Sequence, residues 1–292
     1  MDNEPKNNPV ANERPMLGFV LGFAAVVAFF AVVIGLAALT TGGCCAPPRV
    51  TVAPAAFEPD GTNLVPRAAL VVHLTNVDPE KWNGWDGDCP GTDRDAAVVC
   101  TTLDRLGVPY LALANETATV EGVIAAAQAV GARVAPGGLL MLYFSGHGGQ
   151  RTTGDDEIDN RDETLCLWDG ALLDDTVWAL LCLVPEGVRV WLVTDCCNSG
   201  TNYRAAPHDY ARGVKAWWRR EPDMLHWGAA VDGTSAIGSW QGGFFTRALK
   251  DAYRPGMSYA DWFKAAKQLI KDKQRPAMNH TGKDFSTTEA FQ

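Results

Sequence analysis

The sequence predicts an α/β fold in which helices cover both faces of a mostly parallel central sheet. The first observation is a set of short apolar runs without alternation, typical of strands buried on both faces, over residues 68–74, 139–144 and 188–194. The second is that helical patterns separate these runs, because strands that alternate with helices form parallel sheets. A hydrophobic share of 47% and a charged share of 20% in 292 residues exclude a disordered chain.

The helices can be located from their apolar faces and their ends. Ala96, Cys100 and Leu103 share one helical face, and Gly107 is suited to end that helix. Thr119 is suited to begin the next one, because its hydroxyl can accept a hydrogen bond from a free backbone N–H group. The remaining elements are, in chain order, a helix from Asp174 or Asp175 to before Pro185, a fourth strand over 227–231, and helices over 243–253 and 258–270.

The N-terminal part of the chain contains a long apolar segment. No charged residue occurs between Arg14 and Arg49, and residues 16–39 are almost wholly apolar. As a helix this segment would be about 36 Å long, enough to cross a bilayer core of about 30 Å. We therefore expect a tail over 1–15, then a transmembrane helix over 16–39, and a single-pass membrane protein. A cleaved signal peptide is the alternative, although its apolar core is usually shorter.

The expected arrangement on either side of the membrane follows from nearby charges. Lys6 and Arg14 precede the apolar segment, which slightly favours a cytoplasmic N-terminus and a globular part outside the cytoplasm. Residues 40–66 are rich in proline and glycine, which predicts an extended linker. The globular pattern over 67–292 is long enough to form one sizeable core.

Overall charge and cysteine content exclude several classes of protein. There are 25 Lys and Arg residues against 34 Asp and Glu residues, a formal charge of −9, whereas nucleic-acid-binding proteins usually have a basic excess. Eight cysteines in a chain of this length are too few for a disulfide scaffold, and none has the spacing of zinc ligands.

Two of the predicted strands end in reactive side chains. The strand over 139–144 runs into SGHGG, which contains His147, and the strand over 188–194 runs into DCCNSG, which contains Cys196 and Cys197. Sites in open α/β sheets form beyond the carboxyl ends of strands, so we expect the histidine and a cysteine to meet there. Such a pair can supply an activated thiolate and its general base. The N–H groups of Gly148 and Cys197 are suited to bind an oxyanion.

The segments YFSGHGGQ (143–150) and TDCCNSG (194–200) resemble the two active-site motifs of metacaspases, which are caspase-like cysteine peptidases. The resemblance covers roughly residues 67–253 and implies a caspase-like three-layer sandwich. It also implies that Cys197 is the nucleophile and His147 the base, while Cys196 points towards the core. The chain departs from the family at Asn198, where relatives usually have histidine, and at Thr92, where cysteine is frequent.

The resemblance also implies which peptide bond is cut. In metacaspases, residues matching Asp95 and Asp195 line the S1 pocket, and Ser145 is suited to support them. A carboxylate attracts a cationic side chain. We therefore expect protein or peptide substrates to be cleaved after Arg or Lys. The alternative for Asp95 is a charge that only favours the start of its helix.

Residues 155–175 contain nine carboxylates, offset only by Arg161. Asp162, Asp174 and Asp175 match positions that bind Ca²⁺ in many metacaspases, and hard oxygen ligands suit this ion. The resemblance therefore implies stimulation by Ca²⁺. A solvated acidic loop is the alternative.

Two questions stay open at this level. The basic segment between Tyr203 and Leu225 is a candidate site of self-cleavage, or an uncut surface loop. The whole domain is expected to be an endopeptidase. The alternatives are a catalytically silent caspase-like module tethered to the membrane, and a different acyl hydrolase or transferase with the same cysteine–histidine pair.

Overall fold

The computed structural model describes residues 63–152, 161–203 and 221–292. The expected tail, the transmembrane helix over 16–39 and most of the linker over 40–66 lie outside the described residues. So do residues 153–160 of the acidic segment and residues 204–220 of the basic segment. Within the three described ranges, no helix is both long enough and apolar enough to span a membrane.

The described part of the chain alternates strands and helices. Its elements are β1 (Val65–His73), α2 (Thr92–Arg105), β2 (Tyr110–Ala114), the 3₁₀ helix η2 (Asn115–Thr117), α3 (Val120–Gly131), β3 (Val134–Ser145), β4 (Gly148–Arg151), β5 (Asp162–Cys166), β6 (Ala171–Leu173), α4 (Asp174–Cys182), β7 (Arg189–Asp195), β8 (Met224–Gly228), α5 (Phe244–Ala252), α6 (Tyr259–Ile270) and β9 (Ala277–Thr281).

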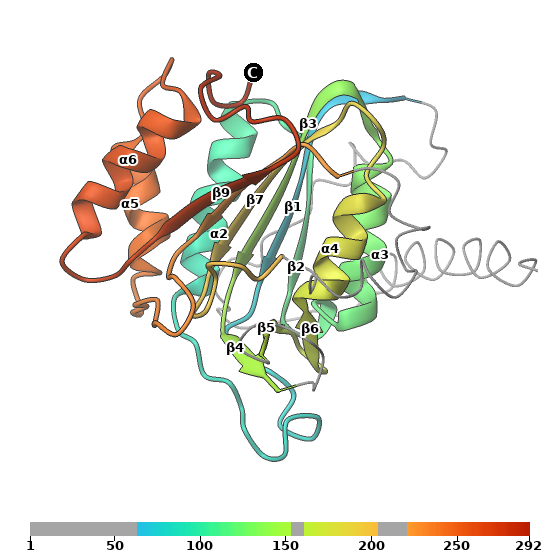
Figure 1. Cartoon of the computed structure of the whole chain (residues 1–292). Helices are drawn as coiled ribbons and strands as arrows, with labels where there is room; N and C mark the ends of the chain where they lie inside the picture. Colours follow the sequence, from blue (N-terminus) through green and yellow to red (C-terminus); the bar gives the residue numbers. More distant parts are fainter. Residues whose placement is uncertain (1–62, 153–160, 204–220) are drawn as a thin grey trace, which may run out of the picture. The chain divides into compact units, whose positions relative to one another are not determined.

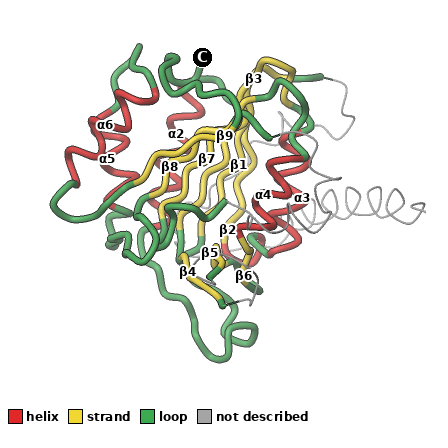
Figure 2. Tube along the Cα trace, in the orientation of Figure 1, coloured by secondary structure: helices red, strands yellow, loops and turns green. Residues whose placement is uncertain are grey.

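A six-stranded sheet with the order β2-β1-β3-β7-β8-β9 forms the centre (Figure 1). Neighbouring strands from β2 to β8 pair in parallel, and only β9 is antiparallel to its neighbour. The predicted α/β class with a mostly parallel sheet is therefore confirmed. A second sheet, β4-β5-β6, is small and antiparallel. Figure 2 shows it near the ends of the main strands.

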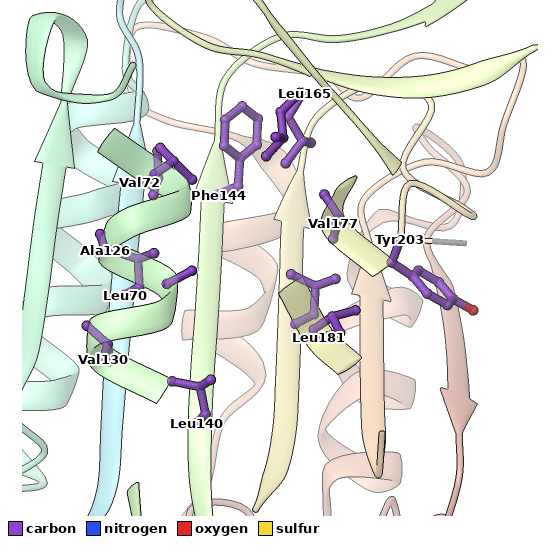
Figure 3. Close-up of a cluster of buried hydrophobic side chains, with 14 of the residues drawn as sticks. Leu70, Val72, Ala126, Val130, Leu140, Phe144, Leu165, Val177, Leu181 and Tyr203 are labelled. Atoms are coloured by element: carbon purple, nitrogen blue, oxygen red, sulfur yellow. The ribbon is translucent and has the colours of Figure 1, made fainter. Parts of the chain in front are cut away.

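Both faces of the main sheet are buried, which explains the non-alternating apolar runs. Leu70 and Leu140 belong to the hydrophobic cluster under α3 and α4, which Figure 3 shows in close-up. The next residues along the same strands, Val71 and Met141, belong to the cluster under α2, α5 and α6. Successive side chains of a strand point to opposite faces, so each of these strands has to be apolar throughout.

The helix ends follow the expected chemistry. The Thr119 hydroxyl accepts a hydrogen bond from the Gly122 N–H group (3.0 Å), which caps α3 as predicted. Gly107 follows α2 with a φ of 62°, a left-handed conformation that favours glycine.

The fourth strand lies at 224–228 rather than 227–231. The apolar pattern was misleading because His226 is fully buried and accompanied by Thr194, at 3.0 Å from its Nε2 atom.

Candidate active site

The register between β3 and β7 brings the two reactive loops to one edge of the sheet. These strands pair in parallel up to Ser145 and Asp195. His147 and Cys197 each follow this last pair by two residues. Adjacent strands lie about 4.8 Å apart. The Gly146 N–H group also donates to the Asp195 carbonyl (3.4 Å), which joins the two loops directly beyond the strands.

Gly148 forms the closest contact between the loops. A Cβ atom at this position would collide with the carbonyl oxygen of Cys197 and would lie 2.9 Å from the Sγ atom of Cys196. The backbone beside His147 therefore touches the backbone of the cysteine loop. The absence of a side chain at position 148 is a condition of this approach.

The two adjacent cysteines have different environments. Cys196 is 1% exposed and belongs to the hydrophobic core, and burial raises the pKa of its thiol well above the ordinary value. Cys197 is half-buried, so solvent and ligands can reach it. Asn198 follows with a φ of 49°, and its side-chain oxygen accepts a hydrogen bond from the Gly233 N–H group (2.9 Å). Asparagine tolerates this left-handed conformation better than most residues.

Further contacts hold the loop after the cysteines. The Asp232 carboxylate accepts hydrogen bonds from the Gly200 N–H group (2.8 Å) and from the Thr201 hydroxyl (2.7 Å). The Asn279 side chain on β9 donates to the Gly200 carbonyl (2.9 Å). The position of the loop that contains Cys197 is therefore fixed from both β9 and the turn after β8.

The contacts of His147 indicate which of its two ring nitrogens carries the proton in the neutral tautomer. Its Nε2 atom lies 3.3 Å from the Asp88 carbonyl oxygen. A carbonyl oxygen only accepts hydrogen bonds, so Nε2 carries the proton in this contact and Nδ1 is the basic nitrogen of the neutral ring. The Trp85 ring lies 5.0 Å from the imidazole, centroid to centroid, at an interplanar angle of 56°. The His147 carbonyl accepts from the Cys166 N–H group (3.0 Å), which attaches this loop to the small sheet.

Two buried carboxylates lie together at the N-terminus of α5. Asp95 is 2% exposed and accepts hydrogen bonds from the Ser145 hydroxyl (2.9 Å) and from the Gly243 N–H group (2.9 Å to each oxygen). Asp195 is 5% exposed and accepts from both the N–H group (2.9 Å) and the hydroxyl (2.7 Å) of Thr246. The structure therefore brings together the three residues proposed from the sequence for the S1 pocket.

The pKa values of both carboxyl groups reflect this location. Burial and the nearby Asp195 charge raise the pKa of Asp95 to about 7, although hydrogen bonds from Gly243 and Ser145 favour the ionised form. Burial also raises the pKa of Asp195, against the hydrogen bonds from Thr246. Two neighbouring carboxylates repel each other when both are ionised. A bound cation offsets this repulsion, so such a pair binds a cation strongly.

An open hollow of about 650 Å³ lies at the N-terminal end of α2, and neither Asp95 nor Asp195 is among the residues that line it. Asp86, Asp88, Asp93 and the exposed Trp240 line it together with Arg94, whose guanidinium lies 5.1 Å from the Trp240 ring centre. Three carboxylates against one guanidinium in this lining give the hollow a net negative charge. A peptide that enters it is expected to benefit from cationic side chains.

The expected Ca²⁺ ligands lie at the start of β5 and α4. Asp162 and Asp174 are each 1% exposed. Asp174 accepts hydrogen bonds from the Glu163 N–H group (3.3 Å) and from the Asp175 N–H group (3.0 Å). Carboxylate oxygens suit Ca²⁺ chemically. Across the described ranges, however, no three or more His, Cys, Asp or Glu side chains are grouped as a metal site, so the three-aspartate assignment stays a prediction.

Several residues around the site were not predicted from the sequence. Asp88 contributes a backbone carbonyl, which no side-chain pattern reveals. Gly243 and Thr246 act through the N-terminus of α5, for which the GGFFT segment was the available signal. Cys89 interacts electrostatically with Asp95, Asp195 and Cys197, and burial is the main cause that raises its pKa to about 12.

Comparisons with known proteins agree with this geometry. The family profile "Metacaspase, peptidase C14 domain" matches residues 100–205. Metacaspase-5 from Trypanosoma brucei brucei is 28% identical over 172 residues, covering 48% of this chain and 34% of that protein. Metacaspase-2 from Arabidopsis thaliana is 28% identical over 187 residues, covering 52% of this chain and 44% of that protein. The chain thus matches less than half the length of these relatives.

Solved structures show the same architecture. A crystal structure of a Geobacter sulfurreducens protein aligns with a TM-score of 0.64 and 27% identity over 77% of this chain and 98% of that one. Caspase-1 from Spodoptera frugiperda aligns with a TM-score of 0.52 and 15% identity over 82% of this chain and 94% of that one, which shows the fold alone. Taken with the two active-site motifs and the family profile, these likenesses show that the chain is similar to the metacaspases, the peptidase C14 group of caspase-like cysteine peptidases.

Proposed function

We propose that this chain is a cysteine endopeptidase that cleaves peptide bonds after Arg or Lys. The observation that carries the proposal is the parallel register of β3 and β7. It leaves His147 and Cys197 at equal distances along the chain beyond the Ser145–Asp195 pair, with Gly148 in contact with the cysteine loop. The half-buried thiol of Cys197 is accessible, whereas that of Cys196 is not.

The first chemical step is attack by sulfur. The Nδ1 atom of His147 takes the proton from the Cys197 thiol, because Nε2 is already engaged with the Asp88 carbonyl. The thiolate adds to the carbonyl carbon of the substrate, and the carbonyl oxygen becomes an oxyanion. The N–H groups of Gly148 and Cys197 are the proposed donors to this oxygen.

The second step releases the products. The imidazolium of His147 gives its proton to the leaving amine as the C–N bond breaks, which leaves an acyl-enzyme on Cys197. A water molecule then gives a proton to His147 and attacks the thioester, and the thiol is restored when the C–S bond breaks.

Specificity follows from the two buried carboxyl groups. An arginine or lysine side chain at P1 would form charge-assisted hydrogen bonds with Asp95 and Asp195, and its positive charge would favour their ionised forms. The negatively charged hollow beside Asp88 supports the same preference. An aspartate at P1 would bring a third carboxylate to the pair and is expected to be rejected.

The test is a set of fluorogenic peptides that differ only at P1 (Arg, Lys, Asp or Leu), assayed on the full chain. We expect turnover of the Arg and Lys peptides and none in the Cys197→Ala variant. A covalent thiol inhibitor with arginine at P1 should label the wild-type protein once. No labelling and no turnover would instead favour a silent interaction module, and labelling only by non-peptide acyl probes would favour another acyl transferase.

Three further features belong to the proposal. Ca²⁺ would bind through Asp162, Asp174 and Asp175 and stimulate the enzyme. Calorimetry with the Asp174→Asn variant, and activity measured in chelator, test this.

Self-cleavage would occur after a basic residue within 204–220, where mass spectrometry of the active enzyme would find new termini. The segment over 16–39 would anchor the enzyme in a membrane as a single-pass protein with the peptidase outside the cytoplasm, which protease protection in vesicles tests.

A further inference from the structure

A second cavity lies away from the active-site edge, between the helices on one face of the sheet. Its volume is about 220 Å³, and its walls come from α2, α5 and α6 and from the strands β3 and β7 beneath them. Figure 1 shows these three helices on the same side of the sheet. Apolar side chains make up most of the lining, including Val99, Leu106, Leu249 and Trp262.

The polar groups of this cavity are mainly hydrogen-bond donors. The exposed side chains of Arg105 and Lys250 lie at its rim, and no acidic residue is among the described residues that line it. Two cationic side chains and no acidic one in this lining favour an anionic ligand, because opposite charges attract.

The size and chemistry of the cavity define the ligand class. An apolar cavity of about 150 Å³ is already large enough to bind benzene. We propose that the cavity between α2 and α5 binds a small amphipathic carboxylate, with its hydrocarbon part among the apolar side chains and its carboxylate toward Arg105 and Lys250. Medium-chain fatty acids and small aromatic acids belong to this class.

The two helices that form the walls also hold the carboxylates of the proposed S1 pocket. Asp95 is in the first turn of α2 and bonds to the Gly243 N–H group at the start of α5. Thr246 of α5 lines the cavity, binds Asp195, and lies 2.6 Å from the Tyr143 hydroxyl, which also lines the cavity. A ligand that separates α2 from α5 would therefore weaken the bond between Asp95 and Gly243. This effect on cleavage rests on the proposed function, whereas binding does not.

The experiment is calorimetry with octanoate, octanol and octylamine on the full chain carrying Cys197→Ala, so that binding is read without activity. We expect octanoate to bind at least tenfold more tightly than octylamine. The Arg105→Gln/Lys250→Gln variant should remove this preference, and Val99→Phe should fill the cavity and abolish binding. Lys264→Gln on the exposed side of α6, which does not line the cavity, is the matched control and should bind like the parent.

In the active protein, octanoate should raise KM for the arginine peptide several-fold with little change in kcat. The proposed site would be refuted if the three probes bound equally. It would also be refuted if octanoate still bound to both the Arg105→Gln/Lys250→Gln variant and the Val99→Phe variant. No binding at all, as when another segment of the chain fills the cavity, would overturn it as well. Binding without a change in KM would overturn the link to S1. An inactive protein that still binds octanoate with the expected preference would refute the peptidase and leave the site standing.

Discussion

The buried carboxyl group of Asp95 makes a quantitative prediction about stability and pH. Its pKa rises from the ordinary 3.8 to about 7 in the folded protein, so between these values the native state holds a proton that the unfolded state has lost. Stability must then fall as the pH rises from about 4 to about 7, and remain level above that. One pKa unit corresponds to about 1.4 kcal/mol, so Asp95 costs about 3 kcal/mol between pH 5 and pH 8.

Substituting Asp95→Asn removes this titration while the amide oxygen can still accept from Gly243. In the Cys197→Ala background, urea unfolding at pH 5 and pH 8 should show that the asparagine variant gains about 3 kcal/mol relative to its parent at the higher pH. Asp93→Asn, which removes an exposed carboxylate from the same helical turn, is the control and must not reproduce the gain. An Asp95→Asn effect of equal size at both pH values would refute the raised pKa of this carboxyl group.

The remaining predictions concern the cysteine loop and its contacts. Cys197→Ala should abolish turnover of the arginine peptide, whereas Cys196→Ala should keep most of it and lower the free energy of unfolding by about 1–2 kcal/mol; the reverse result would contradict the choice of nucleophile. Gly148→Ala should reduce kcat/KM by at least about 100-fold, since a methyl group would push the Cys197 carbonyl away; unchanged kinetics would show that the loops are not in contact. Asn198→Gly should preserve activity, because glycine readily adopts a φ of 49°. Asn198→Val should lower the free energy of unfolding by about 1–2 kcal/mol, because valine does not. Equal melting temperatures for the two variants would argue against strain at this position.

The sequence allowed most of the central layer to be predicted because burial on both faces leaves a continuous apolar run. The runs at β1, β3 and β7 had this property. By contrast, β9 reads Ala-Met-Asn-His-Thr and is half-exposed at the sheet edge, so its apolar content is too low to be recognised. The strands of the small sheet were missed for a similar reason, since β4 is Gly-Gly-Gln-Arg and β6 has only three residues.

Only some residues of the candidate site have a pattern that can be recognised in the sequence. The location of His147 and Cys197 at one edge of the sheet could be predicted because each lies in the loop that follows an apolar strand. The backbone partners could not, because Asp88 accepts from His147 through its carbonyl and Gly243 donates to Asp95 through its N–H group, and every residue except proline offers both groups. Cys89 escaped notice because only the fold brings its loop near the carboxylates.

The hydrogen bond from Asn279 to the Gly200 carbonyl also bears on when a newly made chain could carry out the proposed cleavage. Asn279 follows Cys197 by 82 residues, so at about 5–20 residues per second the ribosome adds it about 4–16 s after Cys197. Until then, the backbone just after Cys197 lacks this support, and β8 presents a free edge. Synthesis order would thus delay the proposed cleavage until the strand that carries Asn279 has been made, which would protect the nascent polypeptide from premature cutting.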